Sequence, residues 1–121
     1  MNLNDTVWCK LGVSKIHGVG VIALRDIPQG QRLYCSAERN FKLLVGIPDD
    51  ILPEIREIIL QRYPLAREGG EYLSPNDDAR LISFVNHSST PNYDWRTDTV
   101  LVDIKKGDEI TEDYGRYAQF A

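Results

Sequence analysis

Residues 84–92 read "FVNHSSTPN", a polar segment that directly follows an apolar run. Asn, Ser and Pro commonly form turns, because their side chains bond to the nearby backbone or restrict it. Taken alone, the segment is compatible with an ordinary turn after a strand. A functional interpretation requires other stretches of the chain to agree with it.

The bulk composition is that of a folded globular protein. Of the 121 residues, 42% are hydrophobic and 26% are charged. The length suits a single domain that spans residues 1–121. The net charge of −4 argues against a protein that mainly coats nucleic acid phosphates, so we expect no direct nucleic acid binding. It favours a basic substrate only weakly.

Targeting signals and cysteines indicate the compartment. The apolar runs are far shorter than the roughly 20 residues of a membrane span, so we expect no membrane association. Residues 1–10 lack the basic start and apolar core of a secretory signal. We therefore expect an intracellular, cytoplasmic protein, or a nuclear one in a eukaryote. Cys9 and Cys35 are expected to be reduced and structural, and with His17 and His87 they lack zinc-finger spacing, so we predict no metal site.

The pattern of apolar residues predicts the secondary structure. Short apolar runs separated by turn signals predict strands at residues 7–13, 17–24 and 31–35. Residues 49–63 instead have helical spacing, with Asp49 or Asp50 as the expected N-cap. Residues 99–115 read as a strand, a turn and a short strand. We predict an α+β fold that is mostly β, with one inserted helix.

Three stretches, in this order, resemble the SET-domain protein lysine methyltransferases. They are Gly18-Val19-Gly20, the Asn-His-Ser-x-x-Pro-Asn stretch at 86–92, and the Gly-x-Glu-Ile-Thr…Asp-Tyr-Gly ending at 107–115. A lone Gly-x-Gly is a weak signal, whereas the stretch at 86–92 is specific. The resemblance implies a SET-type fold of small sheets of short strands, with a knot-like threading of the C-terminal segment past the Asn-His segment.

The resemblance also implies S-adenosyl-L-methionine as the cofactor and a lysine-containing protein or peptide as the substrate. Glycines would let the backbone approach the cofactor closely, and the Asn-His pair would contact it through backbone and amide groups. For His17 and His87 the alternative is a packed, hydrogen-bonded side chain, and for Tyr72 it is a position in a surface loop. The implied cofactor-binding residues are His17, Gly18, Val19, Gly20, Tyr72, Asn86 and His87.

Tyr114, in the Asp-Tyr-Gly ending, is the catalytic residue that the resemblance implies. Its hydroxyl would orient the lysine amine and polarise the methyl hydrogens through weak C–H···O contacts. A lysine is protonated near neutral pH, and a narrow apolar channel would favour loss of that proton before attack. The alternative for an isolated tyrosine is a half-buried sheet residue.

The chain departs from the family pattern in its channel wall. Many relatives have Cys where this chain has Ser89, and a cysteine-rich zinc module closes their substrate channel. Only six residues follow Gly115, so we expect no such module. The wall would then come from Tyr117 and Phe120, from the second subunit of a homodimer, or from the substrate protein.

Glu112 is a second departure, because relatives commonly have an aromatic or aliphatic residue there. Its carboxylate either points into the lysine channel or turns to a solvated face or to Arg116. Two functions therefore stay open. One is a compact lysine methyltransferase, and the other is an inactive binding module that keeps the fold and the cofactor pocket.

Overall fold

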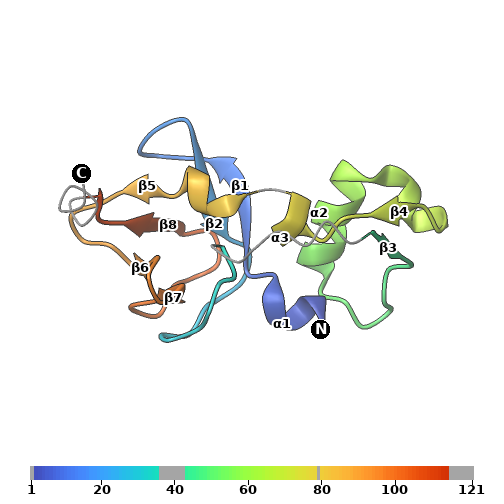
Figure 1. Ribbon diagram of the computed structural model, residues 1–121, viewed down its shortest axis with the longest axis horizontal. Helices are drawn as coiled ribbons and strands as arrows, with labels where there is room; N and C mark the ends of the chain where they lie inside the picture. The colour runs from blue at the N-terminus through green and yellow to red at the C-terminus, as the bar shows by residue number, and fades with distance from the viewer. Residues whose placement is uncertain (1, 36–42, 79, 115–121) are drawn as a thin grey trace.

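In the computed structural model, which describes residues 2–35, 43–78 and 80–114, a sheet-rich part and a helical part lie end to end (Figure 1). The α-helices are α1 (Leu3–Thr6), α2 (Pro53–Arg62) and α3 (Pro75–Asp78), and the 3-10 helices are η1 (Pro64–Glu68) and η2 (Leu81–Phe84). The strands are β1 (Cys9–Val13), β2 (Val19–Ala23), β3 (Leu44–Val45), β4 (Glu71–Tyr72), β5 (Asn86–His87), β6 (Tyr93–Asp94), β7 (Thr99–Val100) and β8 (Glu109–Glu112).

The largest sheet brings the three motif segments together. Its strand order is β1-β2-β8-β5. Strands β1 and β2 form an antiparallel hairpin, and β8 pairs antiparallel with β2 on one side and parallel with β5 on the other. In that parallel pair Asn86 lies opposite Thr111, and His87 lies opposite Glu112. Each of the three motif segments therefore contributes residues to one sheet: Val19 and Gly20 to β2, Asn86 and His87 to β5, and residues 109–112 to β8.

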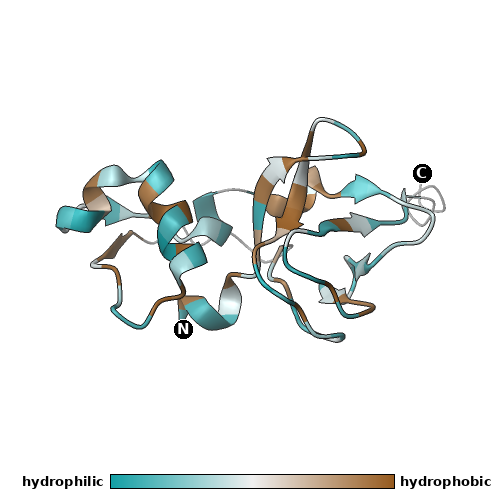
Figure 2. Cartoon of the chain, turned by 180° about the vertical axis from the view of Figure 1, so that it is seen from behind, coloured by the Kyte–Doolittle hydropathy of each residue, from teal (hydrophilic) through white to brown (hydrophobic). Residues whose placement is uncertain are grey.

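Two hydrophobic clusters form the core. One surrounds the four-stranded sheet and the β6–β7 hairpin and contains Val21, Tyr93 and Ile110. The other packs under α2 and contains Ile55, Ile59 and Tyr72. In Figure 2 the hydrophobic residues gather in the β1–β2 hairpin and on parts of α2, where these two clusters lie.

The inserted helix is confirmed, but it begins later than predicted. It starts at Pro53 with Leu52 as its N-cap, so the expected caps Asp49 and Asp50 lie in the preceding turn. A residue before proline avoids helical backbone angles, and Leu52 accordingly has a ψ of 137°. The helix ends at Arg62, just before Pro64 starts η1. Residues 67–78, where Gly69, Gly70 and Pro75 are typical of a loop, contain the end of η1, then β4 and α3.

The strand predicted at residues 31–35 is wrong. Within that described segment, Arg32 makes an isolated β-bridge to Thr99 and no regular ladder forms. Tyr34 has a φ of 60°, which interrupts an extended strand. The Cys35 amide donates to the carboxylate of buried Asp98 at 3.1 Å, so a side chain replaces a strand partner.

Cys9 and Cys35 are both buried free thiols, as predicted. Both thiols lie in the cluster around the four-stranded sheet, and the Cys35 thiol donates to the Leu33 carbonyl oxygen at 3.9 Å. Hydrogen bonding with Cys9 and burial raise the pKa of Cys35 well above its ordinary value. Their separation in sequence gave no sign of this contact.

The fold class is confirmed: the described residues form three small sheets of short strands, few helices and one longer helix inserted between strands. The knot-like threading stays a prediction. In the described part of the chain, no helix is both long enough and apolar enough to cross a membrane.

Candidate functional site

The 14–19 loop, which connects β1 to β2 and includes Val19 as the first residue of β2, is held by its own first residue. The Ser14 amide donates to the Gly18 carbonyl oxygen at 2.8 Å. The Ser14 hydroxyl oxygen in turn accepts from the amides of Ile16 and His17 at 2.9 and 3.0 Å. Gly18 has a φ of 51°, which glycine adopts without strain. The loop is a tight turn whose backbone amides point inward at one hydroxyl.

A single amide on β5 connects this loop to the centre of the sheet. The Asn86 Nδ2 lies 3.1 Å from the His17 carbonyl oxygen and 3.2 Å from that of Val19. It also lies 3.0 Å from the Ser14 hydroxyl and 3.0 Å from Glu109 Oε2. Two of the residues predicted to line the cofactor pocket, His17 and Val19, are thus bonded directly to a third.

The two glycines of the Gly-x-Gly segment have different roles. An added Cβ at Gly18 would meet no described atom within 4 Å, so this side of the loop is open to a ligand. An added Cβ at Gly20 would lie 2.6 Å from Glu109 Oε2 and 3.0 Å from the Ser14 Cβ. Gly20 therefore makes room for a carboxylate inside the protein, and cofactor contact at either glycine stays a prediction.

His87 connects β5 to the end of β8. Its Nδ1 accepts from the Tyr114 amide at 2.9 Å and lies 3.8 Å from the Asp113 carboxylate. The two rings of His87 and Tyr114 are tilted against each other at 5.3 Å between centroids. The Tyr114 hydroxyl donates to the Val85 carbonyl oxygen, the residue before Asn86. Tyr114 is therefore held at both its backbone and its hydroxyl by the segment at 84–92.

The rest of that polar segment bonds along β8. The Asn92 side chain donates to the Glu109 carbonyl oxygen at 2.8 Å and accepts from the Thr111 amide at 2.8 Å. The Ser88 amide donates to the Glu112 carbonyl oxygen at 2.9 Å. These bonds satisfy backbone groups along β8, including those of Thr111 and Glu112, the two residues that pair with β5. The polar residues after Phe84 are thus more than a turn.

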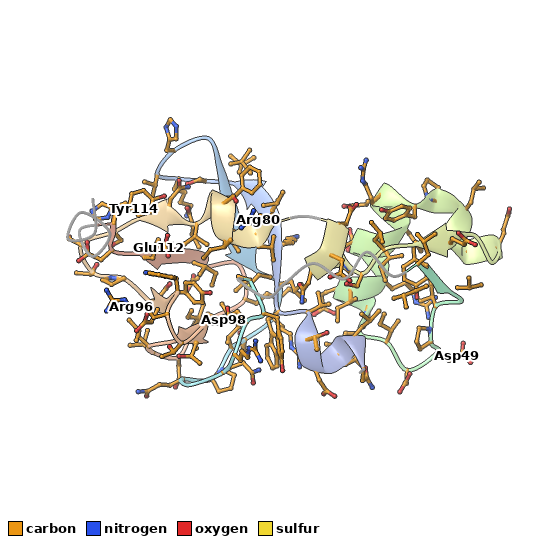
Figure 3. The ribbon with its side chains drawn as sticks, in the orientation of Figure 1. Asp49, Arg80, Arg96, Asp98, Glu112 and Tyr114 are labelled. Atoms are coloured by element: carbon orange, nitrogen blue, oxygen red, sulfur yellow. The ribbon has the colours of Figure 1, made fainter. Side chains whose placement is uncertain are left out.

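Glu112 is buried, with 5% of its surface exposed, so the predicted solvated face is wrong. Arg116, its alternative partner, lies outside the described residues. Burial and the negative charge of Glu112 raise the pKa of Tyr114 above its ordinary value. Figure 3 places both residues at the same end of β8. The tyrosine hydroxyl therefore stays neutral beside a buried carboxyl group.

Tyr72 lies apart from the other predicted cofactor residues. It is 1% exposed in the cluster under α2, and its hydroxyl donates to the Gly46 carbonyl oxygen at 2.8 Å. Burial raises its pKa. The sequence suggested a loop tyrosine, but two-residue strand β4 turns it into the core. The described structure gives it a packing role.

Sequence reasoning missed Ser14 and Glu109. Glu109 stands in the Gly-x-Glu part of the C-terminal motif, which was a usable signal, whereas Ser14 carries none. In the described ranges, no three His, Cys, Asp or Glu side chains gather as they would around a metal ion. Tyr117 and Phe120, expected at the channel wall, lie outside those ranges.

Comparison with known proteins adds one finding. The family model of the SET domain matches residues 18–115, which include all three motif segments. No curated protein gives a significant match to the chain.

Proposed function

Because the chain belongs to the SET-domain family, we propose that it is an S-adenosylmethionine-dependent methyltransferase that acts on a lysine side chain of a protein. SET domains are generally protein lysine methyltransferases. The observation that carries the proposal is the convergence of the 14–19 loop, Asn86, His87 and Tyr114 on one end of one sheet. Without a shared site, these contacts between distant segments would have no common purpose.

The cofactor would bind against the open side of the 14–19 loop. Gly18 provides the close approach, and backbone groups of His17, Val19, Asn86 and His87 provide polar partners around it. When bound, S-adenosylmethionine supplies an electrophilic methyl group on a positive sulfur. The task of the protein is to orient both reactants and to exclude water.

Tyr114 would position the lysine amine. Its hydroxyl hydrogen is directed at the Val85 carbonyl, so the phenolic oxygen can act as an acceptor for an amine N–H or a methyl C–H. The raised pKa keeps this hydroxyl neutral, and the hydrogen bond to Val85 is kept with it. The hydrogen bond from the Tyr114 amide to the His87 ring fixes the backbone from which the Tyr114 side chain extends. Together these contacts hold an acceptor at a defined place.

A specific observation favours a second candidate, an inactive binding module that keeps the fold and the cofactor pocket and holds a lysine side chain without methylating it. Glu112 is buried close enough to Tyr114 to change its pKa. A buried carboxylate stabilises a lysine ammonium, which is not a nucleophile. It would help to capture the side chain but oppose the loss of its proton.

Titration calorimetry with S-adenosylmethionine and with its demethylated product tests the cofactor site. We expect saturable heat with the wild-type protein and weaker binding by Asn86→Ala, because Asn86 orients the His17 and Val19 carbonyls. If the folded wild-type protein gives neither heat nor a thermal shift with either compound, both candidate functions are wrong.

A further inference from the structure

We propose that Glu109 is a positioning residue, which fixes the shape of the 14–19 loop through Ser14 and Asn86 and thereby prepares the loop for the cofactor. This inference rests on the proposed function, since it assigns a role at the same site. Glu109 lies at the start of β8, 95 residues along the chain from Ser14, whose hydroxyl donates to its carboxylate.

Packing does not determine the shape of this loop. Residues 15–19 are all exposed, including the two apolar side chains of Ile16 and Val19, which are 53% and 50% exposed. A turn that buries so little apolar surface gains little from the hydrophobic effect. Its conformation therefore depends on its hydrogen bonds.

The Glu109 carboxylate is the common acceptor of those bonds. It accepts from the Ser14 hydroxyl at 2.8 Å, from the Lys15 amide at 3.3 Å and from the Asn86 side-chain amide at 3.0 Å. All three neighbours present hydrogens, which suits an ionised carboxylate because it only accepts. A side-chain amide in its place would turn an N–H₂ group towards at least one of these donors.

The carboxylate also sets the direction of the two groups that touch the loop. The Ser14 hydroxyl has one hydrogen, and Glu109 takes it, so the lone pairs of the oxygen face the amides of Ile16 and His17. The Asn86 amide is turned in the same way, with its Nδ2 between Glu109 and the His17 carbonyl. Removing the carboxylate frees both groups to rotate.

Gly20 gives an independent test of this arrangement. Its added Cβ would lie 2.6 Å from Glu109 Oε2, and that atom is the end of a flexible side chain. Alanine at this position would therefore displace the carboxylate more easily than the backbone. Gly20→Ala should weaken the loop for the same reason as a change of Glu109 itself.

The first experiment compares Glu109→Gln with Asp108→Asn. Both variants remove one negative charge, but Asp108 is exposed and its carboxylate faces the Lys105 amide in the neighbouring turn. In the ligand-free proteins, we expect faster amide hydrogen exchange at residues 15–17 in Glu109→Gln only. We also expect its Kd for S-adenosylmethionine to rise roughly tenfold or more, as loss of hydrogen bonds to a charged group predicts. Asp108→Asn should match the wild type in both measurements.

The second experiment combines Gly20→Ala with Glu109→Ala. Each single variant should weaken cofactor binding and the protection of the loop from hydrogen exchange. The loss in the double variant should be smaller than the sum of the two single losses, because the nearest atom to the added Cβ of Gly20→Ala belongs to the carboxylate that Glu109→Ala removes, and the 3.0 Å contact with the Ser14 Cβ alone remains. Additive losses would overturn the proposal. The proposal would also be overturned if Glu109→Gln bound S-adenosylmethionine as tightly as the wild type and showed the same amide hydrogen exchange at residues 15–17. If the wild type itself bound no cofactor, the proposed function would fall first, whereas failure of the variants alone leaves that function standing. Ser14→Ala repeats the comparison should Glu109→Gln not fold.

Discussion

Asn86→Asp should destabilise the protein in a pH-dependent way, because it replaces an N–H₂ donor by a carboxylate next to Glu109. The Asn86 Nδ2 lies 3.0 Å from Glu109 Oε2. At that distance two negative charges repel by about 1.4 kcal/mol at a dielectric constant of about 80, and by about 5.5 kcal/mol at about 20. Asn86 is half-buried, so we expect a value between these limits.

Asn86→Ala separates this repulsion from the simple loss of the amide. It removes a hydrogen bond to a charged group, which costs about 1.5–3 kcal/mol, but it adds no charge. At pH 7 we therefore expect Asn86→Asp to be less stable than Asn86→Ala. The repulsion favours a protonated introduced carboxyl group in the folded state. The deficit should thus be absent below the pKa of an unfolded Asp, about 3.9, and grow as the pH rises.

Urea denaturation of both variants at a series of pH values, followed by tryptophan fluorescence, measures this difference. In a Glu109→Gln background the pH-dependent part should disappear, because one of the two charges is gone. Equal stabilities of Asn86→Asp and Asn86→Ala at every pH would refute the placement of Glu109 against Asn86.

Three further predictions concern the tyrosine and the thiols. Tyr114→Phe should keep the fold and cofactor binding but slow methyl transfer roughly 100-fold or more, by loss of one positioned polar group; an unchanged rate in a labelled-methyl assay would exclude Tyr114 as the catalytic residue. Glu112→Gln should lower the pKa of Tyr114, since the carboxylate raises it, and ultraviolet titration against Tyr114→Phe should show the shift. A raised tyrosine pKa contributes stability that is fully present below the ordinary value of about 10 and is lost as the pH rises through the Tyr114 pKa. Glu112→Gln should therefore lose less stability in alkali than the wild type. Cys9 and Cys35 should resist alkylation in the native protein and react on unfolding, because both thiols are buried and, at Cys35, the raised pKa disfavours the thiolate; rapid native labelling of either would contradict their burial.

Local patterns in the sequence were sufficient for strands β1 and β2, the inserted helix and the final strand. Each has a period or a turn residue that acts over a few positions, such as Gly107, whose φ of 93° suits the turn before β8. The helix start was misplaced because the restriction that Pro53 imposes on Leu52 outweighs the capping preference of Asp49. The extra strand at 31–35 failed because Asp98, distant in sequence, takes its backbone bond.

The site was only partly predictable for a related reason. Motif spacing identified Asn86, His87 and Tyr114, and the fold brings these three together. It could not show that Gly20 makes room for Glu109, because that contact depends on the register of β8 against β2. Strand alternation alone also left Glu112 ambiguous, since β8 is buried on both faces from Ile110 onward.

Transfer of an isotope-labelled methyl group from S-adenosylmethionine to protein lysines tests the central claim most directly. A mixture of lysine-rich proteins and peptides is incubated with the wild-type protein or with Tyr114→Phe, and modified residues are located by mass spectrometry. We predict labelled lysines with the wild type and a strong loss of label with Tyr114→Phe. Saturable cofactor binding by the wild type, with no label on any lysine of the mixture, would contradict the claim and favour the binding module.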